Sequence, residues 1–105
     1  MSQADREARL LRAVYRTYGV PASWTPAAGG DAVPLTVRHD TSDEITPMGQ
    51  GQSLQRTNII FVRLSELAEA AKSDTVVSPR GTYRISRSPR LTDDGLEWLC
   101  EAVKT

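Results

Sequence analysis

The sequence predicts a single α+β domain that is mainly β, namely a small, partly open antiparallel β-barrel or sandwich of about six short strands, with an N-terminal helix and a long flexible loop. Three observations support this prediction. Residues 74–103 divide into three short strands at two tight turns, the first 19 residues have a helical apolar period, and residues 40–54 supply few side chains for a core. A chain of 105 residues suffices for one domain, 1–105, and is too short for two ordinary ones.

Residues 1–19 are predicted to form the helix, because apolar residues recur at spacings of three and four and therefore share one face. Ser2 and Asp5 have the spacing of a capping box. Gly19 is expected to end the helix in a left-handed conformation, and Pro21 prevents its continuation. Two interpretations stay open, a lid packed on a sheet or an arginine-rich face that meets DNA or an acidic protein. The apolar face comprises Ala8, Leu11, Val14, Tyr15 and Tyr18, and the basic face comprises Arg6, Arg9, Arg12 and Arg16.

Residues 22–39 are predicted to form a hairpin. A short strand carries Trp24, the turn 26–31 contains two glycines free to adopt positive φ, and residues 32–39 alternate in polarity. Pro34 has no N–H to donate, so we expect this second strand to lie at an edge there.

Residues 40–54 are predicted to form a flexible loop, since they contain two glycines, a proline and few core groups, and are too long for an ordinary connection. Either this loop has no role, or it becomes ordered when a partner arrives.

Residues 55–105 are predicted to form the β-rich core. The strongest strand is 55–64, residues 65–72 form a short helix or a turn, and strands 74–78, 82–88 and 96–104 follow. The Asp-Gly pair in the turn 92–95 is typical of a hairpin, where φ must be positive. In the last strand, Leu96, Trp98, Cys100 and Ala102 share one face, and Glu97, Leu99, Glu101 and Val103 share the other.

The composition excludes several classes of protein. Thirteen basic residues balance thirteen acidic ones, so the chain has no global field to attract DNA or an anionic membrane. The single cysteine fits a reducing compartment. No apolar run approaches the ~20 residues that span a bilayer, and the charged start lacks the apolar core of a signal peptide, so we expect a cytoplasmic origin.

No set of residues for catalysis is recognisable, and we expect no enzyme, no cofactor and no metal site. His39 is the only histidine and Cys100 has no cysteine partner, so neither fits a zinc site. Cys100 is expected to be a core residue. Residues 49–52 are glycine-rich but are not followed by a lysine, and the acidic residues lack the spacing of a calcium loop.

A nucleic-acid-binding surface has more support. Its candidate residues are Arg80, Arg84, Arg87 and Arg90. Tyr83 and Trp98 are then either stacking platforms or core residues, and the alternation of Tyr83 with Arg84 favours the core.

The order of elements, together with three segments, resembles the head–tail joining (tail-attachment) proteins of lambda-like long-tailed phages. The segments are Lys72-Ser73-Asp74-Thr75-Val76, Gly81-Thr82-Tyr83-Arg84-Ile85 and Asp93-Asp94-Gly95-Leu96-Glu97-Trp98-Leu99. The resemblance implies a small β-barrel with an N-terminal helix and a connector ring at the DNA exit of the head, to which the tail docks. It implies no catalytic residues.

The resemblance also implies partners and places. The partners are other copies of the chain, head-completion or portal-side proteins, and tail proteins; the chain is neutral, so DNA contact is not a leading expectation. The protein would lie in the virion, and in the bacterial host cytoplasm during assembly. By position, residues 40–54 correspond to the assembly loop and the helix to a further contact surface. The loop residues predicted to interact are Asp40, Asp43, Glu44, Ile45, Met48, Gln50, Gln52 and Leu54. Alternatives are a tail-terminator or minor tail protein, or a small nucleic-acid-binding barrel.

Overall fold

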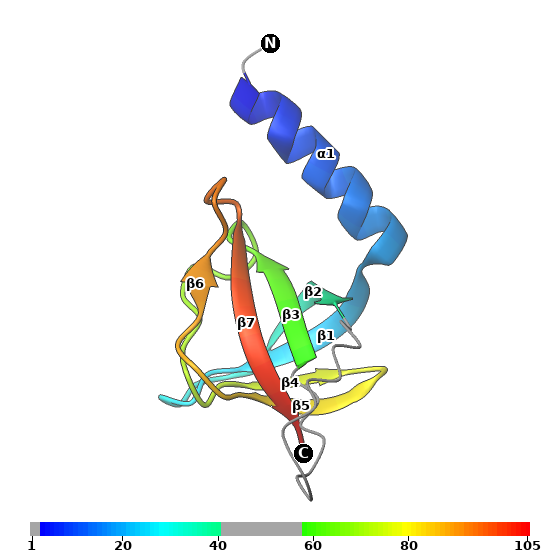
Figure 1. The fold of residues 1–105 in the computed structure, drawn as a ribbon. Helices are drawn as coiled ribbons and strands as arrows, with labels where there is room; N and C mark the ends of the chain where they lie inside the picture. The colour runs from blue at the N-terminus through cyan, green and yellow to red at the C-terminus, as the bar shows by residue number, and fades with distance from the viewer. Residues whose placement is uncertain (1–2, 41–57) are drawn as a thin grey trace, which may run out of the picture.

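A computed structural model describes residues 3–40 and 58–105. The chain forms one helix followed by a mainly β domain (Figure 1). The helix α1 spans Gln3–Tyr18. The strands are β1 Val20–Thr25, β2 Val33–Asp40, β3 Asn58–Arg63, β4 Thr75–Ser78, β5 Gly81–Ile85, β6 Arg90–Leu91 and β7 Glu97–Lys104.

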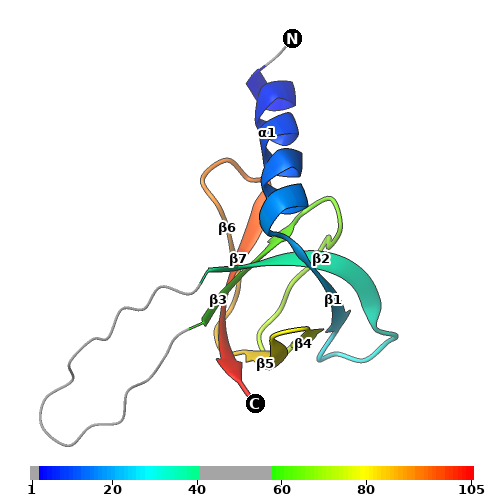
Figure 2. The same ribbon diagram turned by 90° about the vertical axis from the view of Figure 1, so that its right-hand side faces the viewer.

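Six antiparallel strands close into a barrel in the order β3-β2-β1-β4-β5-β7, and β7 pairs back with β3 along its length. The expected barrel is therefore confirmed, and it is closed where the sequence had suggested a partly open one. The short strand β6, which the sequence did not predict, pairs with Trp98 and Leu99 of β7, on the edge that β5 occupies farther along the strand. Helix α1 projects away from one end of the barrel, and the C-terminus lies at the opposite end (Figures 1 and 2).

The core lies inside the barrel and follows the predicted alternation. Tyr83 and Ile85 of β5 point inward while Arg84 is exposed, and Cys100 and Ala102 of β7 are buried. The buried cluster is Trp24, Leu35, Val37, Ile60, Val62, Leu67, Val76, Tyr83, Ile85, Cys100 and Ala102.

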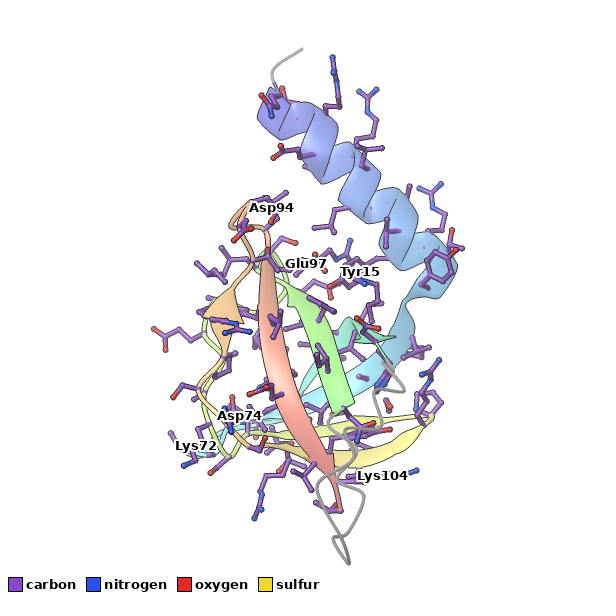
Figure 3. The ribbon with its side chains drawn as sticks, in the orientation of Figure 1. Tyr15, Lys72, Asp74, Asp94, Glu97 and Lys104 are labelled. Atoms are coloured by element: carbon purple, nitrogen blue, oxygen red, sulfur yellow. The ribbon has the colours of Figure 1, made fainter. Side chains whose placement is uncertain are left out.

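A buried carboxylate ties three segments together near the end of the barrel opposite α1 (Figure 3). Asp74 is 3% exposed and accepts hydrogen bonds from Trp24 Nε1 at 2.9 Å, from Ala27 N at 2.8 Å and from Ala71 N at 2.8 Å. Since a buried carboxylate is costly unless it is hydrogen-bonded, these three donors account for an aspartate in the core.

The predicted turns between strands are confirmed. Gly81 and Gly95 have φ values of 137° and 72°, a conformation that favours glycine. Asp94 precedes Gly95 and accepts hydrogen bonds from Thr92 Oγ1 at 2.6 Å and from Leu96 N at 3.0 Å. These bonds, first that of the Thr92 hydroxyl, lower the pKa of the Asp94 carboxyl.

The structure differs from the sequence prediction at Gly19 and decides between the two structures expected for residues 65–72. Gly19 does not adopt positive φ; instead, a Cβ there would meet Tyr15 O at 2.3 Å and Thr36 Cγ2 at 2.6 Å, so glycine is required by close approach of the helix end to β2. Residues 65–72 were expected to form either a short helix or a turn, and the structure has turns there and no helix. Leu67 is buried in the core there and its carbonyl accepts a hydrogen bond from Trp98 Nε1, which overrides the local helix propensity.

The edge expected at Pro34 is present locally. The first half of β2 pairs only with β1, because its pairing with β3 begins at Val37. Positions 34 and 36 lie two residues apart, so their backbone nitrogens point to the same edge of β2, the one away from β1. Pro34 has no N–H, and the N–H of Thr36 donates to Glu66 Oε2 at 2.8 Å.

Candidate functional site

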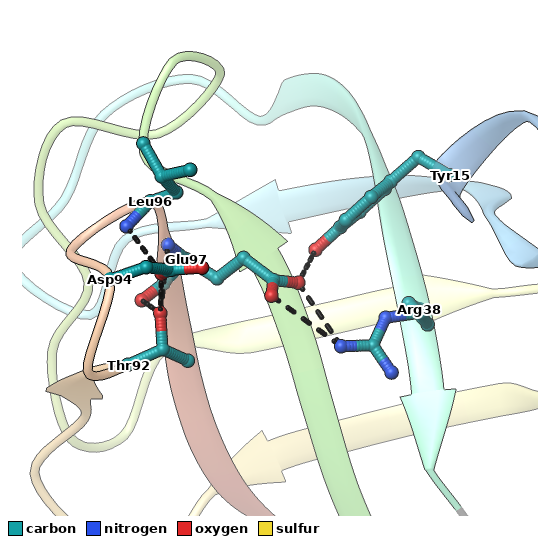
Figure 4. Close-up of polar contacts among 6 residues, drawn as sticks. All are labelled: Tyr15, Arg38, Thr92, Asp94, Leu96 and Glu97. Carbon is teal, nitrogen blue, oxygen red and sulfur yellow. Dashed lines mark hydrogen bonds and ion pairs between the residues drawn. The ribbon is translucent and has the colours of Figure 1, made fainter. Parts of the chain in front are cut away.

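The end of the barrel below α1 holds a buried polar cluster that fixes the helix (Figures 3 and 4). Tyr15 of α1 is 3% exposed, and its hydroxyl donates to Glu97 Oε2 of β7 at 2.7 Å. Glu97 is 5% exposed and also accepts from Arg38 Nη2 of β2, at 3.2 Å. Burial first, and then the hydrogen bond to Glu97, raises the pKa of the Tyr15 phenol. The phenol therefore remains a proton donor to the carboxylate.

A second layer of contacts surrounds the tyrosine ring. The guanidinium of Arg63 lies 4.6 Å from the centre of the Tyr15 ring and forms an ion pair with Glu66 at 2.9 Å. Glu66 also accepts the hydrogen bond from Thr36 N. Tyr15 of α1 is thus held directly by β7 and β3, and these contacts are supported by Arg38 of β2 and by Glu66 of the turn after β3.

The sequence missed this cluster. Alternation correctly placed Glu97 on the face of β7 opposite the core, and such a face is normally solvated. Here α1 covers the end of that face and buries the carboxylate. The signal available in the sequence was an ionisable tyrosine on the apolar face of the helix, which requires a polar partner when buried.

Only part of the predicted apolar face of α1 packs against the barrel. Tyr15 is buried and Leu11 and Val14 are half-buried, whereas Tyr18, which shares this face, is 68% exposed. Leu10 is 61% exposed. The interpretation of α1 as a lid therefore holds only for its middle and last turns.

A groove lies between α1 and the barrel. It has a volume of about 560 Å³ and is lined mainly by half-buried apolar side chains. We call it the helix–barrel groove; its lining residues are Ala8, Leu11, Arg12, Arg63, Leu64, Ser65 and Leu96. A smaller hollow of about 280 Å³, here the arginine pocket, shares two of these residues. It is lined by Arg12, Tyr15, Arg16, Thr36 and Arg63.

The predicted basic face of α1 is confirmed as a solvent-exposed surface. Arg6, Arg9, Arg12 and Arg16 are all exposed. Within residues 3–40 and 58–105, the ion pairs are those of Arg38, Arg63 and Arg87, so these four helix arginines take part in none.

The four arginines predicted for a basic contact surface, Arg80, Arg84, Arg87 and Arg90, are all exposed. Arg80 lies in the turn between β4 and β5, Arg84 lies in β5, and Arg90 lies in β6. Arg87 approaches Glu101 at 3.5 Å. The two aromatic residues considered as stacking platforms belong to the core instead. Tyr83 is buried in the core cluster, and Trp98 is half-buried and packs against that cluster.

Most of the predicted loop residues lie outside the described part of the chain. Asp40 is the exception; it is exposed at the end of β2, opposite Ile59 of β3. The remaining ones are Asp43, Glu44, Ile45, Met48, Gln50, Gln52 and Leu54.

Cys100 and His39, the two residues considered as a catalytic pair, have different surroundings. Cys100 is fully buried, and this burial raises the pKa of its thiol to about 12. His39 Nε2 lies 3.0 Å from Ser78 Oγ, and its ring packs 5.2 Å from that of Tyr83. Burial, and then the charge of Arg80, lowers the pKa of the imidazole.

The described residues lack two further features. They contain no group of three or more histidine, cysteine or acidic side chains arranged to hold a metal ion. They also contain no helix with the length and apolar character required to cross a membrane.

The chain matches the sequence model of a known protein family. The sequence model of the phage head-tail attachment protein family matches residues 2–102, a range that begins at the helix and ends within β7. No curated protein matches the chain.

Proposed function

The chain belongs to the phage head-tail attachment protein family, and from this premise we propose that several copies form a connector ring that joins a DNA-filled head to a tail. The observation that carries the proposal is the extent of the family match, residues 2–102 of the 105-residue chain. The family supports the joining role and the location in the virion. The ring, its partners and its contact residues are our proposal.

The described surfaces support action through protein contacts. Helix α1 is fixed to the barrel at its last turns and projects beyond it, so its exposed side chains are accessible to a neighbour (Figure 2). Large apolar side chains on this helix, Leu10 and Tyr18, are exposed. Exposed apolar groups beside a groove are common at interfaces. We propose that the chain works by such contacts and has no catalytic activity.

We further propose two sets of contact residues from the sequence. The first is the segment from Asp40 to Leu54, in particular Asp43, Glu44, Ile45, Met48, Gln50 and Gln52, as a contact between copies or with the tail. The second is the exposed basic surface of Arg80, Arg84, Arg87 and Arg90.

The test is electron microscopy of a lysate of the phage or induced prophage with this gene deleted. We expect DNA-filled heads beside complete but unattached tails, and joined particles again when the gene is supplied from a plasmid. Abnormal tail lengths or missing tails would instead assign the chain to tail termination or to the minor tail proteins. Infectious particles of normal form would contradict a structural role.

A separate measurement addresses the ring and DNA. Native mass spectrometry of connectors released from particles counts the copies of the chain, and a single copy would contradict a ring. Binding of a DNA oligonucleotide at low salt, and its loss in Arg84→Ala, would place DNA among the partners.

A further inference from the structure

The helix–barrel groove and the arginine pocket form one continuous surface, because Arg12 and Arg63 line both. One part is apolar, with half-buried side chains from α1, from the turn after β3 and from the turn before β7. The other part is basic. A ligand that occupied both parts would bring apolar and anionic groups side by side.

The apolar part is large enough for side chains of a partner. Its volume of about 560 Å³ falls within the range of roughly 300–1,000 Å³ that is usual for ligand sites. Leu11, Leu64 and Leu96 are only half-buried there, so apolar area stays in contact with solvent until a ligand covers it. Covering such area is favourable.

The basic part has more positive than negative charge. Three guanidinium groups line the arginine pocket, and among the described residues only Arg63 has a carboxylate partner, Glu66. The Nε of Arg63 is buried and has no hydrogen-bond partner. Arg12 and Arg16 lie one helical turn apart, so their side chains can reach the same anion. Carboxylates are well matched to guanidinium groups because both form paired hydrogen bonds.

We propose that this continuous surface binds an amphipathic acidic segment of a partner protein, with leucine-type side chains in the helix–barrel groove and carboxylates in the arginine pocket. A segment of this kind fits the recognised mode in which an amphipathic helix lies in an apolar groove. The alternative, a DNA backbone, lacks groups that would cover the leucines. The inference rests on the proposed joining function, since it names the kind of segment by which a head or tail protein would be held.

Two pairs of neighbouring residues on α1 provide matched variants. Leu11 lines the groove, whereas Leu10 is exposed and lines neither hollow. Arg12 lines both hollows, whereas Arg9 is exposed and lines neither. Leu11→Asp and Leu10→Asp, or Arg12→Glu and Arg9→Glu, therefore make the same chemical change on the same helix, inside and outside the site.

The binding probe is a fluorescein-labelled synthetic helix of about 15 residues with a leucine stripe and glutamate elsewhere. The comparison probes are the same peptide with lysine for glutamate, and a short DNA duplex. We expect the acidic peptide to bind at least ~10-fold tighter than either comparison probe, and Leu11→Asp and Arg12→Glu each to weaken it by ~10-fold. Leu10→Asp and Arg9→Glu should change it by less than ~3-fold. Equal losses within the matched pairs, or tighter binding of the duplex, would overturn the inference.

The same four variants, expressed in the gene-deleted phage, separate this inference from the proposed function. We expect joined particles with wild-type protein, Leu10→Asp and Arg9→Glu, and few with Leu11→Asp and Arg12→Glu. If all four variants restore joining, the groove is not the contact although the joining role stands. If the wild-type protein does not restore joining, the proposed function fails, and the peptide measurement alone decides whether the groove binds an acidic segment. Arg12 is exposed, so Arg12→Glu tests the site without disturbing the core.

Discussion

Removal of one hydroxyl group tests whether the buried polar cluster holds α1 against the barrel. In Tyr15→Phe the ring remains and can still pack below Arg63, but the hydrogen bond from the hydroxyl to Glu97 Oε2, 2.7 Å long, is lost. Glu97 keeps the interaction with Arg38. The change therefore isolates the hydrogen bond from Tyr15 of the helix to Glu97 of β7.

The expected cost follows from burial and charge. Tyr15 and Glu97 are 3% and 5% exposed, so water cannot readily replace the lost donor. A hydrogen bond to a charged group contributes roughly 1.5–3 kcal/mol. Because Arg38 continues to compensate the carboxylate, we expect a loss near the lower end, about 1.5–2 kcal/mol. A domain of this size has a total stability of about 5–15 kcal/mol, so the change is readily measured.

The assay is urea unfolding followed by tryptophan fluorescence, together with hydrogen exchange of the α1 amides. The matched control is Tyr18→Phe, because Tyr18 is 68% exposed on the same helix and should change stability by less than ~0.5 kcal/mol. Exchange in the last turns of α1 should accelerate in Tyr15→Phe alone. Equal stabilities of the two variants would refute the assignment of the cluster as the attachment point of the helix.

Four further predictions concern Tyr15, Cys100, Asp74 and Gly19. The pKa of the Tyr15 phenol is raised, so its contribution to folding stability is complete below the ordinary pKa near 10 and is progressively lost as pH rises above that value. The stability of the wild-type protein should therefore fall more steeply above pH 10 than that of Tyr15→Phe. The Cys100 thiol, with its pKa raised to about 12, should not react with a thiol reagent at pH 8 until urea unfolds the chain. Asp74→Ala should cost about 3–5 kcal/mol, since it leaves Trp24 Nε1 and two backbone donors without acceptors. Gly19→Ala should cost about 2 kcal/mol or more, because its Cβ would press on the helix end and on β2.

The Asp74 prediction has two matched controls in the chain, and Tyr15→Phe is the control for the pH dependence. Asp74→Asn can keep an acceptor for at most some of the three donors and should fall between wild type and Asp74→Ala; a cost of Asp74→Ala below ~1 kcal/mol would contradict the role of the carboxylate. Exposed Asp93→Ala should be within ~0.5 kcal/mol of wild type. Rapid labelling of Cys100 in the folded protein would contradict its burial. A Gly19→Ala variant as stable as wild type would contradict the close approach at Gly19. Equal stability of the wild-type protein at pH 9 and pH 11 would contradict the raised pKa of Tyr15.

The elements with a strong local pattern could be predicted from the sequence. Alternation identified the inward side chains of β5 and β7, and the Asp-Gly pair identified the turn before β7, because these features depend on neighbours in the chain. The family resemblance rested on the same segments and was confirmed by the match to residues 2–102.

Features that depend on distant parts of the chain could not be predicted. The closure of the barrel requires β3 to pair with β7, and nothing in either strand specifies that partner. The burial of Glu97 requires a helix more than 75 residues earlier, since the hydrogen bond to Tyr15 spans 82 positions. The groove beside α1 arises from the angle at which the helix leaves the barrel, and a helical period does not determine that angle.

The half of β2 that pairs only with β1 bears on how the chain limits aggregation through exposed strand edges. An open strand edge is a template on which another chain can add a strand. At this edge one donor is absent because residue 34 is proline, and the donor of Thr36 is already occupied by Glu66. A second copy therefore gains little from extending the sheet here. Any association between copies at this edge would therefore have to use side-chain contacts rather than an extension of the sheet.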